Sequence, residues 1–429
     1  MIQSWNRYPR VTHAQVIDLW DRHAPLPGTD RPLLPHGNGR SYGDVCLNAG
    51  GVLLRTRPLD RFIVFDRATG RLRCEAGVLL RDILNLTVPQ GWFPAVTPGT
   101  QYVTVGGAIA NDVHGKNHHV AGSFGHHVRC LELLRSDGTR MLCSPEKNPD
   151  WFRATVGGLG LTGLITWAEL QLIPIANPAL VTETHSFATL DGFWDLNREL
   201  ERRWPYTVAW IDCTARLGRG LLLAGAHAPM QAHPFAWRSR SWRFPLEPPI
   251  SLVNSLSLRL FNQIYYHLPR GKGRQLSHYQ PFFYPLDRIR EWNRLYGRRG
   301  FFQYQCVLPP QAARKGVAEL LQCIAASGSG SFLAVLKTFG DKPSAGMLSF
   351  PRPGVTLALD FPNRGPETLA LFRELDAVVR DAGGGLYPAK DARMPGELFR
   401  RAYPEWENFQ RFIDPQFSSS FWRRVTGEA

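Results

Sequence analysis

Residues 97–119 read TPGTQYVTVGGAIANDVHGKNHH, and the interpretation of the whole chain depends on this stretch. Its first part is small and rich in glycine, so its backbone can come very close to a flat ligand. Its last part, residues 114–119, holds three histidines and one lysine in six positions. These side chains are compatible with a metal site, a cluster of catalytic bases or the wall of a cofactor site.

A metal site is the weakest of these three interpretations. His114 and His118 have the spacing of two ligands on one helix face, but no acidic residue lies between them. Gly115 also disfavours a helix at this point. Lys116 would repel a cation, whereas it suits an electron-rich, partly anionic ring. We therefore expect no bound metal, and we expect some of the histidines to bond backbone carbonyls.

Two more glycine clusters lie at 36–43 and 156–164. The first, HGNGRSYG, misses the G-x-G-x-x-G fingerprint by one residue, and no Gly-Lys-Ser/Thr of a P-loop follows it. Its backbone amides can still surround pyrophosphate oxygens, to which Arg40 adds positive charge. Ordinary turns explain each cluster singly. Three clusters together favour a backbone cradle around one ligand.

The bulk composition indicates a globular protein. A chain of 429 residues is too long for one ordinary core, so two domains are expected. The hydrophobic content of 44% and the charged content of 20% argue against disorder. The seven cysteines are scattered and form no Cys-x-x-Cys pair, which favours a reducing cytoplasm over a disulfide framework. The first ten residues lack the plan of a signal peptide.

The net charge of +14 favours an anionic partner. Phosphate, nucleic acid and an acidic membrane surface all satisfy this requirement, and charge alone does not choose among them. No apolar run reaches the ~20 residues that a membrane span needs. A cytoplasmic location is therefore expected, with peripheral contact to the inner membrane surface as an open possibility.

Local patterns predict mixed, short elements without regular βαβ alternation, which indicates an α+β protein. We expect helices at 11–23, with Thr12 as N-cap, and at 79–91, closed by Gly91. Residues 130–143 predict a hairpin that turns at Asp137-Gly138.

Five motifs, in order along nearly the whole chain, resemble those of a known group of flavoproteins. They are PHGNGRSYGD (35–44), the segment from 97 to HGKNHHVAGSFGHHV (114–128), ATVGGLGLTGLI (154–165), FFQYQCVLP (301–309) and LYPAKDAR (386–393). Together they are similar to the vanillyl-alcohol-oxidase type with its PCMH-type FAD-binding domain, and especially to members that oxidise a lipid-linked pentose. The resemblance implies a split FAD-binding domain, 1–177 plus 385–429. It also implies an inserted substrate domain, 178–384, built on an antiparallel sheet, with a mobile segment around 227–280.

The resemblance also implies roles for individual residues. FAD is expected to bind non-covalently, because Tyr42 stands where relatives that oxidise alditols and aldonolactones carry a histidine linked to the flavin. The residues expected to hold FAD are Pro35, His36, Gly37, Asn38, Gly39, Arg40, Ser41, Tyr42, Gly43, Asp44, Gly99, Thr100, Thr104, Val105, Gly106, Gly107, Asn111, Asp112, Val113, His114, Ile165 and Tyr387. Those expected to act in catalysis are Lys390, Lys116, Gln305, Lys337 and Tyr42. Those expected to contact the substrate are Gln303, Gln305, Lys337, Thr356 and Phe283.

The implied reaction oxidises the 2′-hydroxyl of a polyprenyl-phosphate-linked pentose to a ketone, with hydride transfer to flavin N5. This is the first half of an epimerisation for cell-wall arabinan, which a short-chain NAD(P)H-dependent reductase would complete. An alternative is an FAD oxidase of a free sugar, aldonolactone or alditol. A non-catalytic basic module for membranes or nucleic acid is a third possibility, and nucleic acid is not the expected partner.

Two departures from the family pattern bear on the sugar rather than on flavin chemistry. Thr356 and Ala358 stand where the family has asparagine and cysteine, and Phe283-Tyr284 replaces a tyrosine-histidine pair.

The segment from 235 to 274 suggests contact with a lipid surface. FAWRSRSWRF (235–244) interleaves Trp237 and Trp242 with Arg238, Arg240 and Arg243. Downstream lies an apolar stripe at helical spacing, which comprises Leu252, Leu256, Leu260, Ile264 and Leu268. A basic run follows this stripe and comprises Arg270, Lys272 and Arg274. This pattern is typical of an interfacial helix, although a buried helix followed by a basic loop has the same sequence features.

Overall fold

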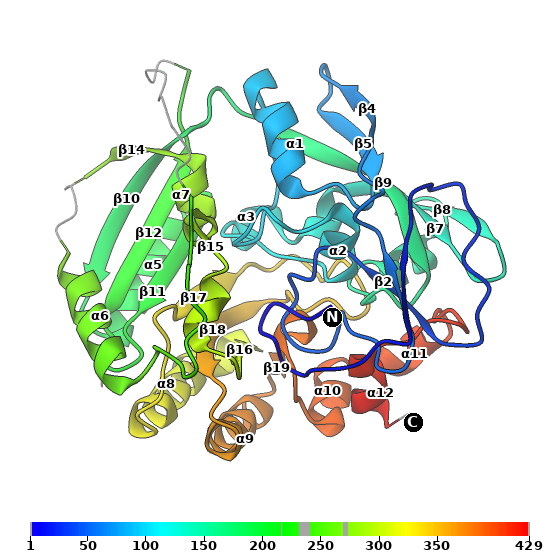
Figure 1. Ribbon diagram of the computed structural model, residues 1–429. Coiled ribbons are helices and arrows are strands. Elements are labelled where there is room, and N and C mark those ends of the chain that lie inside the picture. Colours follow the sequence, from blue (N-terminus) through cyan, green and yellow to red (C-terminus); the bar gives the residue numbers. More distant parts are fainter. Residues whose placement is uncertain (1, 216, 231–240, 269–272, 428–429) are drawn as a thin grey trace.

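Two antiparallel sheets at opposite sides of the molecule organise the chain (Figure 1). The computed structural model describes residues 2–215, 217–230, 241–268 and 273–427. Within these residues the larger sheet has eight strands, all antiparallel. Their order is β14 (Gln275–His278), β10 (Ala179–Phe187), β12 (Gly220–His227), β11 (Tyr206–Ile211), β17 (Val335–Phe339), β18 (Gly354–Pro362), β16 (Phe301–Leu308) and β19 (Gly385–Leu386).

The smaller sheet gathers strands from the first 174 residues. Its order is β4 (Phe62–Asp66), β5 (Arg71–Glu75), β9 (Leu164–Pro174), β7 (Val128–Leu134) and β8 (Arg140–Cys143), and β6 (Trp92–Pro94) also pairs with β9. The predicted hairpin is confirmed: β7 and β8 pair antiparallel, and Gly138 in the turn has φ +85°. Glycine takes this left-handed conformation without the penalty that a Cβ imposes.

A third sheet corrects the helix predicted at 11–23. Residues Gln15–Asp18 form strand β1, which pairs parallel with β3 (Val52–Arg55), and β3 pairs with β2 (Leu33–His36). The apolar spacing of 11–23 matches a helix, but hydrogen bonds to a strand far along the chain decide the conformation, because tertiary pairing overrides weak local propensity. The helix predicted at 79–91 is confirmed as α1 (Leu80–Thr87) followed by a 3-10 turn that ends at Gly91.

The two faces of the larger sheet have different surroundings. Helices α5 (Leu190–Glu201), α8 (Pro310–Ala326) and α9 (Pro366–Asp381) pack on one face and share an apolar core with it. The other face lines a cavity. Because side chains alternate along a strand, this arrangement buries one set of residues and presents the other set to a ligand.

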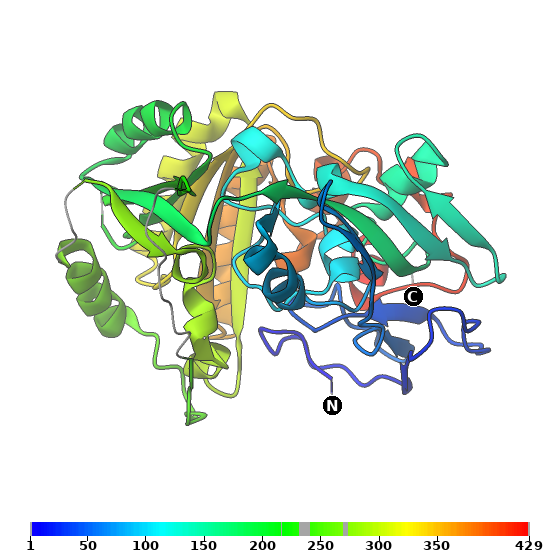
Figure 2. The ribbon, with the colours of Figure 1, turned by 90° about the horizontal axis from the view of Figure 1, so that it is seen from above.

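The remaining helices are short, apart from α6. They are α2 (Val105–Ala110), α3 (His118–Ala121), α4 (Pro149–Thr155), α6 (Ser255–His267), α7 (Tyr279–Phe283), α10 (Gly396–Ala402), α11 (Trp406–Gln410) and α12 (Ser420–Thr426). Helix α6 lies at the end of the molecule away from the smaller sheet, as both views show (Figures 1 and 2). Over the described residues, none of the helices combines the length and apolarity that a membrane crossing requires.

The α+β class and the antiparallel sheet expected after residue 178 are both confirmed. The chain passes from the smaller to the larger sheet between β9 and β10. The largest apolar cluster joins Leu34 and Leu161 to Phe302 and Leu375, so it crosses the expected boundary. The division into 1–177 with 385–429 and 178–384 stays a prediction.

Part of the segment predicted to be mobile, 227–280, lies outside the described residues, and its mobility stays a prediction. The residues outside the description include Trp237, Arg238, Arg240, Arg270 and Lys272.

Candidate active site

One cavity of about 820 Å³ lies between the glycine loops and the open face of the larger sheet. Its wall contains residues of all three glycine clusters, of strands β16, β17 and β18, and of the segment 387–390. The structure therefore brings together motifs that are hundreds of positions apart in the sequence. Three regions of the wall differ in chemistry: a glycine cradle, a lysine cluster and an apolar arm.

The glycine cradle begins at the loop after β2. The backbone amides of residues 38–41 donate no hydrogen bond to any described residue, and they follow one another along the cavity wall. The Arg40 guanidinium stacks 4.2 Å from the Trp5 ring centre and 5.4 Å from that of Tyr102, and its Nε is buried without a partner among the described residues. Consecutive free amides beside a held arginine fit the pyrophosphate of FAD.

Two glycine clusters meet inside the cradle. A Cβ on Gly37 would lie 2.4 Å from Thr104 Oγ1, so only glycine allows this approach. Thr104 is the N-cap of α2 and accepts a hydrogen bond of 3.2 Å from the Gly107 amide. Asn111, at the end of α2, has a buried Oδ1 without a partner among the described residues. The cradle thus presents unpaired donors and an acceptor to a bound cofactor.

Most residues predicted to hold FAD line this cavity. They are Pro35, Gly37, Asn38, Gly39, Arg40, Ser41, Tyr42, Gly99, Thr100, Thr104, Gly106, Gly107, Asn111, Val113, His114, Ile165 and Tyr387. The residues predicted to act on the substrate line it as well. They are Lys116, Phe283, Gln303, Gln305, Lys337, Thr356 and Lys390, together with Tyr42.

Three residues predicted to hold FAD do not line the cavity, because their polar or apolar groups are used inside the protein. His36 is buried and its Nδ1 lies 2.9 Å from the Cys46 carbonyl oxygen. Val105 belongs to the apolar core. Asp112 accepts hydrogen bonds from the Gly125 amide at 2.9 Å and from a serine hydroxyl at 2.6 Å. These residues shape the loops that form the wall.

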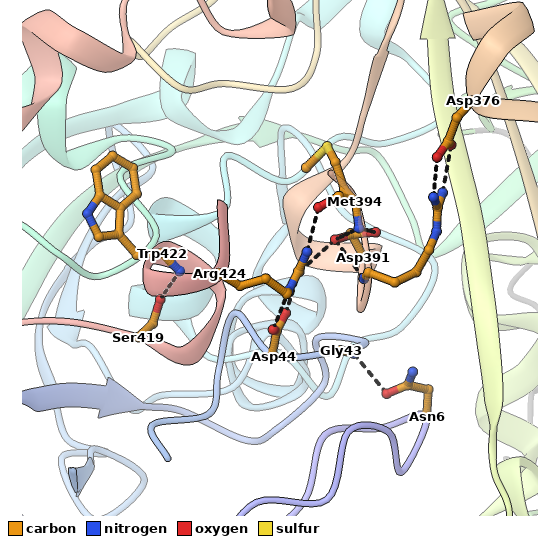
Figure 3. Close-up of polar contacts among 10 residues, drawn as sticks. Asn6, Gly43, Asp44, Asp376, Asp391, Met394, Ser419, Trp422 and Arg424 are labelled. Atoms are coloured by element: carbon orange, nitrogen blue, oxygen red, sulfur yellow. Dashed lines mark hydrogen bonds and ion pairs between the residues drawn. The ribbon is translucent and has the colours of Figure 1, made fainter. Parts of the chain in front are cut away.

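Gly43 and Asp44 also lie outside the cavity wall, where they attach the first glycine loop to other segments (Figure 3). The Gly43 amide donates to Asn6 Oδ1 at 2.8 Å. Arg424 on α12 donates to both carboxylate oxygens of Asp44 at 2.8 Å and to Asp391 at 2.8 Å. Asp391 directly follows Lys390, so one arginine ties the glycine loop to the lysine segment.

Three lysines converge on the cavity next to this cradle. Burial lowers the pKa of Lys116 and of Lys337 to about 7 and that of Lys390 to about 8. The charges of Lys116 and Lys390 lower the pKa of Lys337 further. Such lysines change charge near neutral pH, which surface lysines do not. The cluster can therefore hold an anion or, in its uncharged form, accept a proton.

Lys390 ends the short turn Pro388–Lys390 and lies over the face of Tyr42. The Tyr42 amide donates to the Ala389 carbonyl at 2.9 Å, which fixes this contact. Asp360 on β18 faces the same place and receives a 2.6 Å hydrogen bond from Gln303. Its burial raises the pKa of the Asp360 carboxyl, and its charge raises the pKa of Lys390.

The sequence analysis missed Asp360. A signal for it was present, because Thr356 and Ala358 were already placed on the family's substrate strand. Alternation by two along β18 places Asp360 on the same face as these two residues, and all three line the cavity.

His114 connects Lys337 with Gln305. The Gln305 amide donates to His114 Nε2 at 3.0 Å and to Thr356 Oγ1 at 3.2 Å. The other ring nitrogen of His114, Nδ1, lies 2.7 Å from Lys337 Nζ, which also donates to the Gly115 carbonyl at 2.9 Å. Burial first, and then the Lys337 charge, lower the pKa of His114 well below its usual value, which keeps the ring neutral.

Lys116 and Phe283 both line the cavity. The Lys116 ammonium donates to the Phe282 carbonyl and lies 4.8 Å from the centre of the Phe282 ring. Tyr284, the second residue of the pair that differs from the family pattern, is buried, and its hydroxyl lies 2.6 Å from Thr97 Oγ1. Both rings of the Phe283-Tyr284 pair are therefore buried, and only Phe283 lines the cavity.

The apolar arm is the third region of the wall, and the sequence analysis did not identify it. It is lined by Val208, Trp210, Leu223, Tyr265, Leu333 and Val335. They lie on strands β11, β12 and β17 of the larger sheet, on the segment that leads into β17, and on α6. The cavity thus changes from charged to apolar along its length. Among the described residues, no three His, Cys, Asp or Glu side chains are placed to hold a metal ion.

The sequence is similar to those of known proteins. A family model described as an FAD binding domain matches residues 13–144. Decaprenylphosphoryl-beta-D-ribose oxidase of Mycolicibacterium smegmatis is 36% identical over 413 residues, which cover 92% of this chain and 89% of that protein. An uncharacterised protein encoded in the mprA 5′ region of Streptomyces coelicolor is 34% identical over 373 residues, which cover 81% of this chain and all of that protein (100%).

More distant relatives match only part of the chain. Mouse L-gulonolactone oxidase is 31% identical over 140 residues, which cover 32% of this chain and 31% of that enzyme. The cofactor is FAD, as the glycine cradle and the matching domain both indicate. The chain belongs to the decaprenylphosphoryl-β-D-ribose oxidase family of FAD-dependent oxidoreductases.

Proposed function

We propose that this protein oxidises the 2′-hydroxyl of a pentose that is linked through phosphate to a polyprenyl chain, and that the product is a ketone. The observation that carries this proposal is the composition of the cavity wall. The glycine cradle, the lysine cluster and the apolar arm follow one another in one cavity. A sugar with a phosphate and a long hydrocarbon has the same three chemical parts.

Bound FAD supplies the acceptor for the hydride that leaves the alcohol carbon. The chain holds this cofactor through the amides of residues 38–41, through Arg40 and through the loop that Thr104 caps. Tyr42 offers no imidazole for a covalent bond, so the cofactor is held by these contacts alone.

Lys390 and Lys337 have distinct roles in this proposal. Lys390, fixed over Tyr42, supplies positive charge where the reduced cofactor becomes anionic. The proton of the sugar hydroxyl needs an acceptor inside the cavity, and the uncharged Lys337 amine beside His114 provides one. Lys116, Gln303, Gln305, Thr356 and Phe283 position the sugar and its phosphate.

The proposal extends to the setting of the enzyme. The ketone is a suitable substrate for a short-chain NAD(P)H-dependent reductase, which would complete an epimerisation that supplies arabinose to cell-wall arabinan. We place both steps in the cytoplasm, at the inner membrane surface. We also propose the two domains 1–177 with 385–429 and 178–384, which meet at the cavity.

Anaerobic mixing of the FAD-loaded protein with a panel of sugars tests this function. Loss of the oxidised flavin absorbance should be fastest with a polyprenyl-phosphate-linked pentose. Free alditols, aldonolactones and sugar phosphates should reduce the flavin much more slowly. Faster reduction by a water-soluble alditol would instead support the oxidase of free polyols. Pentoses that differ from one another at one carbon should also be compared, with the wild type and with Thr356→Asn. This comparison reports which sugar the chain selects.

A further inference from the structure

An exposed apolar stripe runs along α6 and the residues on either side of it. The exposed fractions are 46% for Leu252, 76% for Leu256, 60% for Leu260, 56% for Ile264 and 52% for Leu268. Their spacing of four places them along one side of the helix. A contiguous row of large apolar side chains in water marks an interaction surface.

The helix is held so that this stripe faces outward. Leu258 packs inward, and the Asn262 amide donates to Asp212 Oδ1 at 2.7 Å. Arg219 pairs with Asp212 at 2.9 Å and also donates to Gln263 at 2.6 Å. These contacts fix the rotation of α6, so the stripe cannot turn into the protein without breaking them.

An aromatic series connects the stripe with the cavity. Trp210 and Tyr265 both line the apolar arm and meet edge to face, with ring centres 4.8 Å apart. Tyr265 stacks on Phe261 at 5.5 Å, and Phe261 is 38% exposed. Apolar contact is therefore continuous from the cavity wall to the surface.

The charge of this region indicates which surface α6 binds. Residues 248–274 contain no aspartate or glutamate, whereas they contain Arg259, Arg270, Lys272 and Arg274, of which Arg274 pairs with Glu183 at 3.1 Å. An apolar row beside basic residues is typical of a helix that lies in the headgroup layer of an anionic membrane. A protein partner with an apolar groove would not require this bias in charge.

We propose that α6 docks the enzyme on an anionic membrane through Leu256, Leu260 and Ile264. The apolar arm beneath the helix then takes up the hydrocarbon chain of the substrate from that membrane. This inference rests on the proposed function, because it assigns the arm to the lipid part of the substrate. A second copy of this chain is the competing occupant of the stripe.

Flotation with vesicles tests the proposal directly. The FAD-loaded protein is mixed with vesicles of equal parts phosphatidylcholine and phosphatidylglycerol, and the bound fraction is measured by density centrifugation. The variant Leu256→Gln, Leu260→Gln, Ile264→Gln should bind at least about tenfold more weakly, because three apolar side chains no longer leave water. The matched control Trp20→Gln, Val64→Thr, Leu142→Thr changes three exposed apolar residues elsewhere and should bind like the wild type.

Turnover measurements separate this inference from the proposed function. Both variants should oxidise a pentosyl phosphate with a short, water-soluble isoprenoid chain at the wild-type rate. With the long-chain substrate in vesicles, only the α6 variant should lose most of its activity. Unchanged vesicle binding of the α6 variant overturns the docking proposal. The proposal is also overturned if the wild type does not bind vesicles but forms dimers, and the α6 variant does not form them. Absence of turnover on every lipid-linked pentose overturns the proposed function, and the flotation result is still interpretable.

Discussion

The ammonium group of Lys390 lies 3.7 Å from the centre of the Tyr42 ring. One residue belongs to the C-terminal Tyr-Pro-Ala-Lys segment and the other to the first glycine loop, so the two ends of the sequence meet at one point of the cavity. In the proposed mechanism the loop holds the cofactor and the lysine reaches the reacting centre, which couples binding to chemistry. Substitutions at this contact should therefore separate the two functions.

Lys390→Ala should retain FAD and lose turnover. The cradle formed by residues 38–41 stays intact, whereas the positive charge beside the reacting centre disappears, so kcat should fall about 100-fold or more. Flavin absorbance per protein and kcat with the lipid-linked substrate measure the two effects. Lys315→Ala, on the exposed side of α8, is the matched control and should have no effect. Full activity of Lys390→Ala would remove this lysine from the mechanism.

The flavin should be released when the protein is denatured. The family resemblance implies that Tyr42 replaces a flavin-linked histidine, and the Tyr42 ring packs edge to face on Phe301 at 5.4 Å. Acid precipitation should therefore leave a colourless pellet and a yellow supernatant. A pellet that keeps its flavin absorbance after washing would contradict non-covalent binding.

Asp360→Asn should change the pH dependence of the reaction. The Asp360 charge raises the pKa of Lys390, which burial lowers, so removal of the carboxylate lowers that pKa further. If Lys390 acts as a cation, the alkaline limb of kcat/KM should move to lower pH by about one unit. Asp381→Asn, at the exposed end of α9, should leave the profile unchanged. An unshifted profile in Asp360→Asn, with FAD still bound, would show that the carboxylate does not act on Lys390.

Binding of a sugar phosphate to the FAD-loaded enzyme should take up protons at pH 8. The pKa of Lys116 is lowered to about 7, so this amine is mostly uncharged at that pH. A phosphate beside it favours the ammonium form, and the required proton comes from the solution. Calorimetry in two buffers of different ionisation enthalpy measures this uptake. It should shrink below pH 6, where Lys116 is already charged, and in Lys116→Met.

Arg424→Leu should destabilise the protein and weaken FAD binding. The change leaves the buried carboxylates of Asp44 and Asp391 without their counter-charge, which costs about 3–5 kcal/mol of the free energy of unfolding. Urea denaturation and FAD content measure the two effects. The control Arg401→Leu, at an exposed position of α10, should change neither. A variant that unfolds like the wild type would show that other contacts hold the loop.

Short sequence patterns correctly predicted those elements whose conformation depends on neighbouring residues alone. The helix at 79–91 has its apolar spacing and a closing glycine with φ +79°, and both act over a few residues. Residues 11–23 show a similar spacing, yet Gln15–Asp18 pair with Val52–Arg55. That hydrogen-bonding partner lies too far along the chain for spacing alone to reveal it.

The candidate site divides in the same way. The glycine loops and the Tyr-Pro-Ala-Lys segment are short motifs, and they were found in the sequence. The apolar arm depends on how Trp210 and Tyr265 meet after folding, which no single segment encodes. Asp360 had a signal in the sequence, its alternation with Thr356 and Ala358 along one strand, but its effect on Lys390 is visible only after folding.

The clamp formed by Arg424 has a consequence for biosynthesis. The cavity takes residues from Trp5 to Lys390, and the arginine that locks its first loop is translated later still. A nascent polypeptide on the ribosome therefore carries an open, unlocked cradle until that arginine has emerged. Insertion of the prosthetic group should follow translation rather than accompany it.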